Sequence, residues 1–209
     1  MTWQPYSGRF AGLDARRQEE AAREIILGCP PLMRTLHTLR ETGLPDAWLV
    51  SGALYGNIWN TLTGRACDHG VKDYDILYFD PDTSYEAEDA VIRRWTPAFA
   101  VDPPHEIRNQ ARVHLWYEAH FGQPYAPLSE TREAIRRFAS TTHAIGARLN
   151  PKLEIYAPYG LDDIFSLRLA PNTRLENHAT HERKARRQMA AWPELTFVPW
   201  PDAVAEETS

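Results

Sequence analysis

Residues 72–79 read Lys72-Asp73-Tyr74-Asp75-Ile76-Leu77-Tyr78-Phe79, a run of strand-forming residues that contains two aspartates separated by one residue. Alternate side chains of an extended chain share a face, so the carboxylates of Asp73 and Asp75 should point the same way from backbone positions roughly 6 to 7 Å apart. Two ionised carboxylates this close repel each other, and a divalent cation relieves the repulsion. The pair therefore predicts a metal site; the alternative is a solvated strand face near a turn.

The segment upstream of the aspartates predicts a strand, a tight turn and a helix. Residues 46–50 end in a short apolar run, Ser51 and Gly52 are small, and apolar residues then recur at a four-residue spacing up to a helix stop at Gly64. Small residues let a ligand approach the backbone, and the free N–H groups at a helix start favour a phosphate. Phosphoryl or nucleotidyl transfer requires at least a phosphate-binding site beside a metal-binding site.

These residues resemble the pattern of the nucleotidyltransferases of the DNA polymerase beta type, in which a hydrophobic residue, Gly, and Gly or Ser precede Asp-x-Asp or Asp-x-Glu. Ser51-Gly52 and Asp73-Tyr74-Asp75 stand in those places. The chain is most similar to an uncharacterised bacterial branch of that superfamily, through residues 51–55, 59–60, 69–75, 108–116, 156–163 and 168–172. Two departures stand out: the order of Gly and Ser is reversed, and the spacer between Gly52 and Asp73 is longer than usual.

The resemblance implies a mixed α/β (α+β) fold, with a small twisted sheet that carries the acids, helices packed against it, and additional helical segments at both ends of the chain. We expect a single domain over residues 1–200 with its core at about 45–160, followed by a frayed tail at 201–209. Residues 14–27 and 31–40 read as helices that precede the core.

A further helix is predicted after the acidic strand. Thr83-Ser84-Tyr85-Glu86 fits a capping box, in which the Thr83 hydroxyl and the Glu86 carboxylate bond to free backbone N–H groups. This helix should continue to about Trp95.

The superfamily implies a third carboxylate on a strand next to the acid pair, where it completes the metal cage or helps to activate the attacking hydroxyl. Chain order nominates Glu106, in the first strand-like stretch after the predicted helix. Glu154, on a later apolar strand, is the rival. The structural alternative for Glu106 is an ion pair with Arg108 on the same strand face.

Directional donors cluster just beyond Glu106 and predict recognition of a triphosphate or a base. They are Arg108, Asn109, Gln110 and Arg112, and arginine suits phosphate because its planar fork bonds two oxygens at once. The alternative is that the two amides stabilise a turn. Lys184 matches a position that the family tends to keep basic, which makes it a phosphate candidate. Lys72 should point away from the acids if the strand is regular, so no catalytic role is expected for it.

The predicted function is transfer of a nucleoside monophosphate from a nucleoside triphosphate to an unknown acceptor hydroxyl, with Mg²⁺ or Mn²⁺ as cofactor and release of pyrophosphate. Asp73, Asp75 and Glu106 are the predicted catalytic and metal-binding residues. The acceptor could be a protein, an RNA end or a small molecule. One alternative is a nucleotide-binding or regulatory module without turnover, which the altered Gly-Ser turn suggests; another is a glycosyltransferase that uses its Asp-x-Asp pair to hold a sugar nucleotide.

Composition agrees with a compact enzyme. The chain has 209 residues, of which 43% are hydrophobic, enough for a sizeable core, and its two cysteines are too few for a disulfide framework or a cysteine zinc site. No apolar run reaches membrane-spanning length and the first residues lack the features of a secretion signal, so we expect a cytoplasmic protein. The formal charge of −5 provides no overall basic field for nucleic acid.

Overall fold

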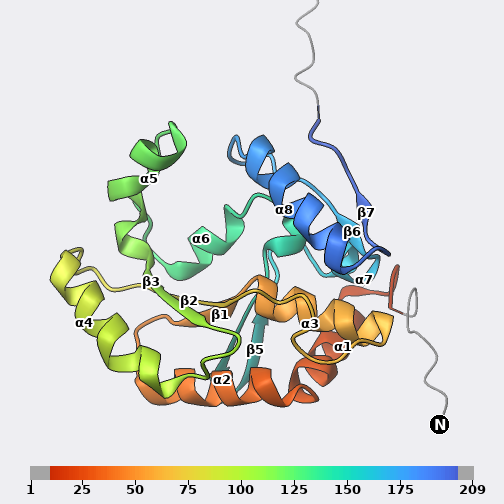
Figure 1. Ribbon diagram of the computed structural model, residues 1–209, viewed down its shortest axis with the longest axis horizontal. Coiled ribbons are helices and arrows are strands. Elements are labelled where there is room, and N and C mark those ends of the chain that lie inside the picture. The colour runs from red at the N-terminus through yellow and green to blue at the C-terminus, as the bar shows by residue number, and fades with distance from the viewer. Residues whose placement is uncertain (1–9, 202–209) are drawn as a thin grey trace, which may run out of the picture.

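The centre of the computed structural model, which describes residues 10–201, is a five-stranded mixed sheet with the strand order β3-β2-β1-β4-β5 (Figure 1). Its strands are β1 (Trp48–Val50), β2 (Tyr74–Tyr78), β3 (His105–Asn109), β4 (Gly146–Asn150) and β5 (Lys152–Tyr156). β2 and β3 pair in parallel, and the other neighbours are antiparallel. The small mixed sheet predicted from the sequence is confirmed.

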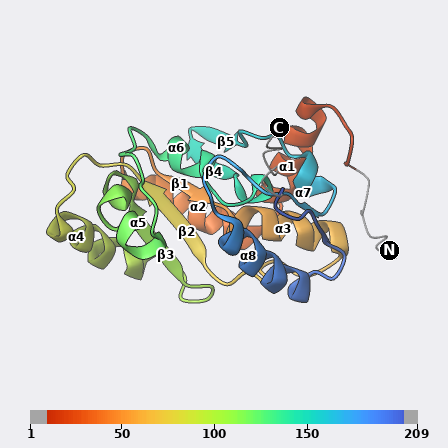
Figure 2. The same cartoon turned by 90° about the horizontal axis from the view of Figure 1, so that it is seen from above.

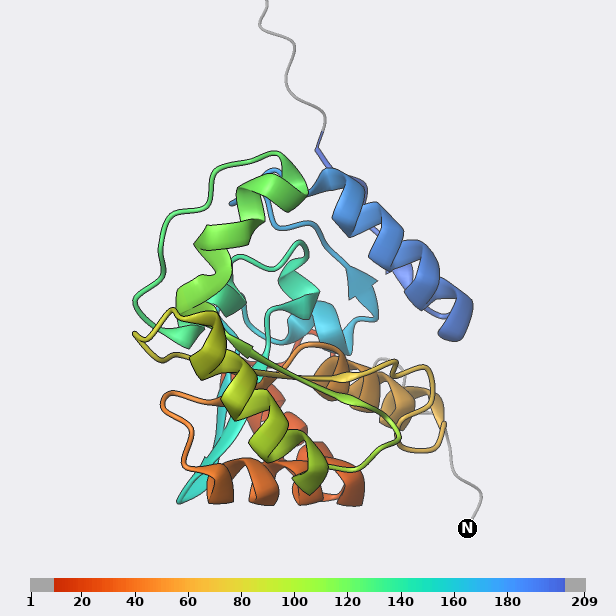
Figure 3. The same cartoon turned by 60° about the vertical axis from the view of Figure 1, so that its left-hand side comes forward.

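Helices cover both faces of this sheet. Figure 3 shows the sheet nearly edge-on, with α1 and α2 on one side and α5, α6 and α8 on the other. The helices are α1 (Ala15–Leu27), α2 (Pro30–Thr42), α3 (Gly52–Thr63), α4 (Tyr85–Trp95), α5 (Val113–Phe121), α6 (Thr131–Arg136), α7 (Asp162–Phe165) and α8 (His178–Ala191). A second sheet pairs β6 (Arg168–Leu169) with β7 (Thr196–Phe197) in parallel.

The alternation of side chains along the strands separates two apolar clusters. Leu49, Ile76 and Ile107 lie opposite one another in register and join the larger cluster, which also contains buried residues of α1, α2 and α3. Trp48 and Leu77, also opposite one another, turn to the other face and join a smaller cluster with α6. Asp75 is paired with Val50 in β1, a member of this smaller cluster, so the acidic face of β2 is the face that carries the smaller cluster.

The helices predicted at both ends of the chain are present. α1 begins after Asp14, whose carboxylate caps the helix by accepting from the N–H of Arg17. A hydrogen bond joins the C-terminal end of α8 to α3: the indole N–H of Trp192 donates to the side chain of Asn60 at 2.8 Å. Figure 2, seen from above, shows α8 beside α3 and α5 at the opposite end of the sheet.

The predicted capping box is wrong by one residue. The N-cap of α4 is Ser84, whose hydroxyl accepts from the N–H of Ala87 at 3.3 Å, so Thr83 lies one residue before the cap. The end of this helix at Trp95 agrees with the prediction. Within residues 10–201, no helix is long and apolar enough to cross a membrane. The predicted tail lies, from residue 202 onward, outside the described residues.

Candidate active site

The two aspartates line one cavity of about 160 Å³, which we call the acid cavity. Asp73 stands immediately before β2, and Asp75 is the second residue of that strand. The other walls come from the turn before α3, the loop before β2, and α8. They are formed by Ser51, Gly52, Tyr55, Gly70, Val71, Lys72, Lys184, Arg187, Gln188 and Trp192. Three segments far apart in the sequence thus meet around the acid pair.

The acid cavity contains opposite charges, and the charges of Asp75 and Lys184 each influence the pKa of the other. Burial and the neighbouring charge of Asp73 raise the pKa of Asp75 to about 6, and the ammonium group of Lys184 acts in the opposite direction. Burial lowers the pKa of Lys184, while Asp75 opposes that shift. The ionised carboxylate of Asp75 is therefore held in a site that disfavours its charge, and further positive charge would stabilise it.

Glu106 occupies the position beside Asp75 on the adjacent strand, where the parallel pairing of β2 and β3 sets the two residues opposite each other. Its side chain is 46% exposed, and its Oε2 lies 3.5 Å from an Nη of Arg108. The carboxylate is thus next to the acid pair but turned toward the arginine. Within the part of the chain that the structure describes, no three Asp, Glu, His or Cys side chains are grouped closely enough to hold a metal ion as they stand.

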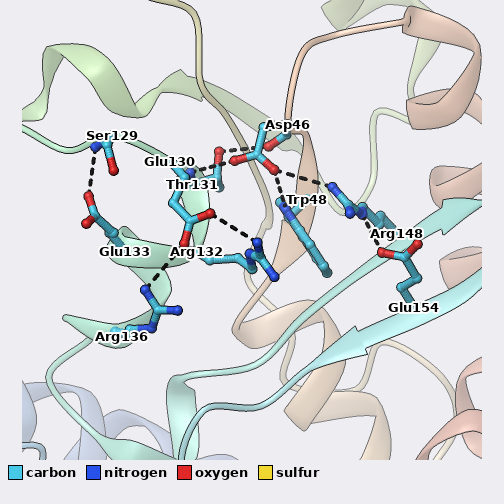
Figure 4. A network of polar contacts seen from close by, with 10 residues as sticks. All are labelled: Asp46, Trp48, Ser129, Glu130, Thr131, Arg132, Glu133, Arg136, Arg148 and Glu154. Carbon is cyan, nitrogen blue, oxygen red and sulfur yellow. Dashed lines mark hydrogen bonds and ion pairs between the residues drawn. The ribbon is translucent and has the colours of Figure 1, made fainter.

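Glu154 belongs to a different part of the sheet. It lies on β5, which β1 and β4 separate from β2. Its carboxylate accepts from the Nε of Arg148 at 2.7 Å, and the same guanidinium contacts Asp46 at 3.3 Å (Figure 4). The sheet order therefore separates the rival third carboxylate from the acid cavity.

The turn before α3 has an unusual backbone at Ser51. This residue has φ 57° and ψ −118°, a conformation that residues with a side chain rarely adopt. Its N–H donates to the carbonyl of Ile145 in the segment before β4 at 2.9 Å, which helps to hold the turn. α3 begins at the next residue, Gly52, and has no acidic residue in its first turn. Gly52, whose N–H group has no intrahelical acceptor, lines the acid cavity. The N–H groups of Leu54 and Tyr55 donate to the carbonyl of Ser51 at 2.9 and 3.1 Å.

A chain of buried hydrogen bonds supports this turn. The hydroxyl of Ser51 bonds that of Tyr55, which also accepts from Nε2 of Gln188 at 2.5 Å. Oε1 of Gln188 lies 2.9 Å from Nε2 of His143, whose ring stacks on Tyr55. Burial raises the pKa of Tyr55 to about 12 and lowers that of His143 to about 3, so both groups are neutral near neutrality. The sequence analysis did not predict this series of hydrogen bonds, although Tyr55 lies in a segment that carries the family resemblance.

Three cationic side chains line the acid cavity. Lys184 and Arg187 are three residues apart on one face of α8. Lys72 also lines the cavity, and its Nζ lies 2.8 Å from Oδ2 of Asp73. The prediction that Lys72 points away from the acids is therefore wrong, because the regular strand begins only at Tyr74.

The donors beyond Glu106 lie elsewhere. Asn109 holds a turn: its Oδ1 accepts from the N–H groups of Asp80 and Ala111, and its Nδ2 donates to the carbonyls of Asp80 and Asp82. Arg112 forms an ion pair with Glu88 at 2.5 Å. Among the predicted nucleotide-binding residues, the structure therefore brings Ser51, Gly52 and Lys184 to the acid pair. Asn109 and Arg112 have local partners instead.

Gln110 and Arg108 lie beside a second cavity. The side-chain amide of Gln110 donates to the carbonyl of Arg108 at 3.3 Å. Both residues, together with Asn109, line a cavity of about 350 Å³ that is distinct from the acid cavity.

The mixed sheet and the acid pair beside a helix start define a nucleotidyltransferase of the polymerase beta-like class. A family model described as Nucleotidyltransferase matches residues 37–197, and the chain belongs to this family. The chain is also similar to a protein structure solved by NMR and described as revealing a CCA-adding enzyme head domain, with 27% sequence identity and a TM-score of 0.67. That match covers 86% of this chain and 95% of the other. No curated protein matches the chain.

Proposed function

We propose that this chain is a metal-dependent nucleotidyltransferase, which moves a nucleoside monophosphate from a nucleoside triphosphate to an acceptor hydroxyl and releases pyrophosphate. The observation that supports this most directly is the acid cavity, in which Asp73 and Asp75 share walls with the Ser51-Gly52 turn and two cations of α8. The family and the related head domain support nucleotide transfer in general.

The residues present fit a divalent cation. Asp73 and Asp75 would hold it, because they offer carboxylate oxygens in one cavity, and burial together with the charge of Asp73 raises the pKa of Asp75, so that a cation would stabilise its ionised form. We assign Glu106 as the third carboxylate, since the strand pairing sets it opposite Asp75. When bound there, Mg²⁺ or Mn²⁺ supplies charge neutralisation for the phosphoryl oxygens.

The protein's own residues provide binding and orientation. Lys184, Arg187 and the N–H group of Gly52 at the start of α3 bind the β- and γ-phosphates, because all three residues line the acid cavity. The acceptor oxygen forms a bond to the α-phosphorus while the bond from that phosphorus to the pyrophosphate oxygen breaks. The hydroxyl proton passes to the carboxylate of Glu106 and from there to solvent.

A nucleotide-binding module without turnover is the second candidate. The orientation of Glu106 toward Arg108 favours it, because only two carboxylates then line the acid cavity. The glycosyltransferase alternative gains no support, since the two matches describe a nucleotidyltransferase and a CCA-adding enzyme head domain.

The test is a transfer assay with the full chain, each α-labelled nucleoside triphosphate, Mg²⁺ or Mn²⁺, and cell extract. We expect one class of molecule to acquire label with matching release of pyrophosphate, and Asp75→Asn to reduce both by at least about a hundredfold. Glu20→Gln, which removes an exposed carboxylate on α1, is the control for charge. Binding of nucleotide without pyrophosphate release would favour the second candidate, and turnover by Asp75→Asn at the wild-type rate would refute the assignment of the acids.

A further inference from the structure

The second cavity lies on the same face of the sheet as the acids. Leu77 follows Asp75 by two residues in β2, and Arg108 follows Glu106 by two in β3, so these side chains share one face. The register pairs Leu77 with Arg108 and Asp75 with Glu106. Leu77 and Arg108 line the second cavity. It therefore begins roughly 7 Å along the strands from the acid pair.

Four aromatic side chains contribute to the walls of this second cavity, and we call it the aromatic cavity. It is lined by Leu77, Val113, Trp116, Tyr117, Tyr125 and Phe138, among others. The rings of Tyr117 and Tyr125 lie 4.3 Å apart, and Trp116 is 45% exposed at its edge. A volume of about 350 Å³ falls within the range of small-molecule sites. Its aromatic side chains suit a planar ring.

Two guanidinium groups provide the accessible charge of the aromatic cavity. Arg108 is exposed, and Arg137 lies with its Cζ 4.6 Å from the ring centroid of Tyr125. The carboxylate of Glu88 also lines the cavity, but it accepts from the N–H of Asn109 at 2.8 Å and pairs with Arg112. An anionic group on a bound ring would thus lie near guanidinium groups, each of which can donate hydrogen bonds to two of its oxygens.

The position of the aromatic cavity relative to the phosphate-binding groups indicates which substrate it takes. Lys184 and Arg187 of α8 line the acid cavity together with the start of α3, and Figure 2 shows α8 beside α3, at the end of the sheet opposite α5. The leaving pyrophosphate is bound there in the proposed function. In an in-line displacement the attacking oxygen enters from the side opposite the leaving group. Figure 1 shows α8 and α5 above the two ends of the sheet, and the aromatic cavity lies at the α5 end.

We propose that the aromatic cavity is the acceptor site, and that the acceptor is a small molecule with a planar aromatic body, a hydroxyl and an anionic group that pairs with Arg108 or Arg137. The inference rests on the proposed function, because it takes the acid cavity as the nucleotide site. It narrows the acceptor to a molecule that the cavity encloses, rather than an RNA end or a protein surface.

The test compares Trp116→Ala and Arg137→Gln with Leu115→Ala, which removes a neighbouring α5 side chain that is 55% exposed and does not line the cavity. Extract is separated into small-molecule, RNA and protein fractions, and each fraction is offered to the enzyme with labelled nucleotide. We expect label in the small-molecule fraction, at least tenfold less of it with the first two variants, and unchanged nucleotide affinity in all three. Label in RNA or protein, or equal labelling by all variants, overturns the proposal.

A binding measurement separates failure of this inference from failure of the proposed function. Ligand-observed NMR of the full chain uses hydroxymethylbenzoate as the probe and its uncharged amide as the comparison. We expect binding that prefers the carboxylate and weakens at least tenfold in Trp116→Ala and Arg137→Gln. If no fraction is labelled and no pyrophosphate is released, the proposed nucleotide transfer is wrong. Binding of the probe then still tests whether the aromatic cavity binds an anionic aromatic ligand. Binding that is absent or insensitive to both variants contradicts the site.

Discussion

Asp75 and Glu106 stand directly opposite each other in the parallel pairing of β2 and β3. The chain leaves β2, forms α4 and returns in the same direction as β3, so a carboxylate from each strand reaches the same face. Burial and the charge of Asp73 are the main causes of the raised pKa of Asp75, and the charge of Glu106 acts in the same direction. This concentration of negative charge destabilises the folded protein and favours the binding of a cation.

Asp75→Asn should therefore stabilise the metal-free protein. The pKa of Asp75 is raised from 3.8 to about 6, so its ionised form near neutral pH destabilises the folded state by about 3 kcal/mol. A neutral side chain of the same size removes that cost. Thermal unfolding in a chelator should show a rise in Tm, at about 2–4 °C per kcal/mol for a chain of this length. Glu20→Gln should leave Tm almost unchanged, and a lower Tm for Asp75→Asn would contradict the charge balance described above.

Lys184→Met should weaken nucleotide binding. The ammonium group is half-buried and lines the acid cavity, where a charge-assisted bond to a phosphate oxygen is worth about 1.5–3 kcal/mol. We expect KM for the nucleoside triphosphate to rise about tenfold or more. Arg183→Met removes an exposed charge from the adjacent position of α8 and serves as the matched control. Equal KM values for the two variants would remove Lys184 from the phosphate site.

Tyr55→Phe should disturb the Ser51 turn with little change in side-chain volume. The phenolic oxygen accepts from Gln188 at 2.5 Å and bonds the Ser51 hydroxyl, and its loss leaves a buried amide without that partner. We expect a loss of about 1–3 kcal/mol in the free energy of unfolding, together with a raised KM for nucleotide. Tyr85→Phe, at an exposed position of α4, is the control. Unchanged stability and KM would show that the buried chain of bonds does not support the turn.

Acidification should destabilise the protein partly through His143. Its folded-state pKa is lowered to about 3 by burial, whereas the unfolded side chain titrates at 6.5. Between these values the unfolded chain binds one more proton, so stability is lost as pH falls below 6.5. The loss from this residue is about 2 kcal/mol between about pH 7 and about pH 5. His143→Gln should lose less by that amount in urea unfolding, while His37→Gln, at an exposed site, should follow the wild type. Parallel losses in all three proteins would assign the acid sensitivity to other groups.

The sequence predicts the local elements around the acids well, because each has its own signal. The apolar run after Asp46, the small residues at 51 and 52, and the stop at Gly64 correspond to β1, the turn and α3, whose C-cap glycine has φ 74°. Chain order also favours Glu106 over Glu154, and the sheet order explains why: β3 neighbours β2, whereas β5 lies at the other edge.

The errors and omissions have physical causes. Side-chain alternation predicts direction only within a regular strand, and Lys72 lies before β2 begins. Adjacent hydroxyl residues at 83 and 84 offer two equivalent caps, and local sequence does not decide between them. The bonds that join His143, Gln188 and Tyr55 link three distant segments through burial, and no local pattern encodes them.

The most direct test of the central claim is a crystal structure of the full chain with Mn²⁺ and a non-hydrolysable nucleoside triphosphate, in which anomalous scattering locates the ion. We expect an ion within about 2.0–2.3 Å of carboxylate oxygens of Asp73 and Asp75, with the β- and γ-phosphates against Lys184 and the start of α3. An ion or a triphosphate bound elsewhere, with both aspartates free of metal, would contradict it.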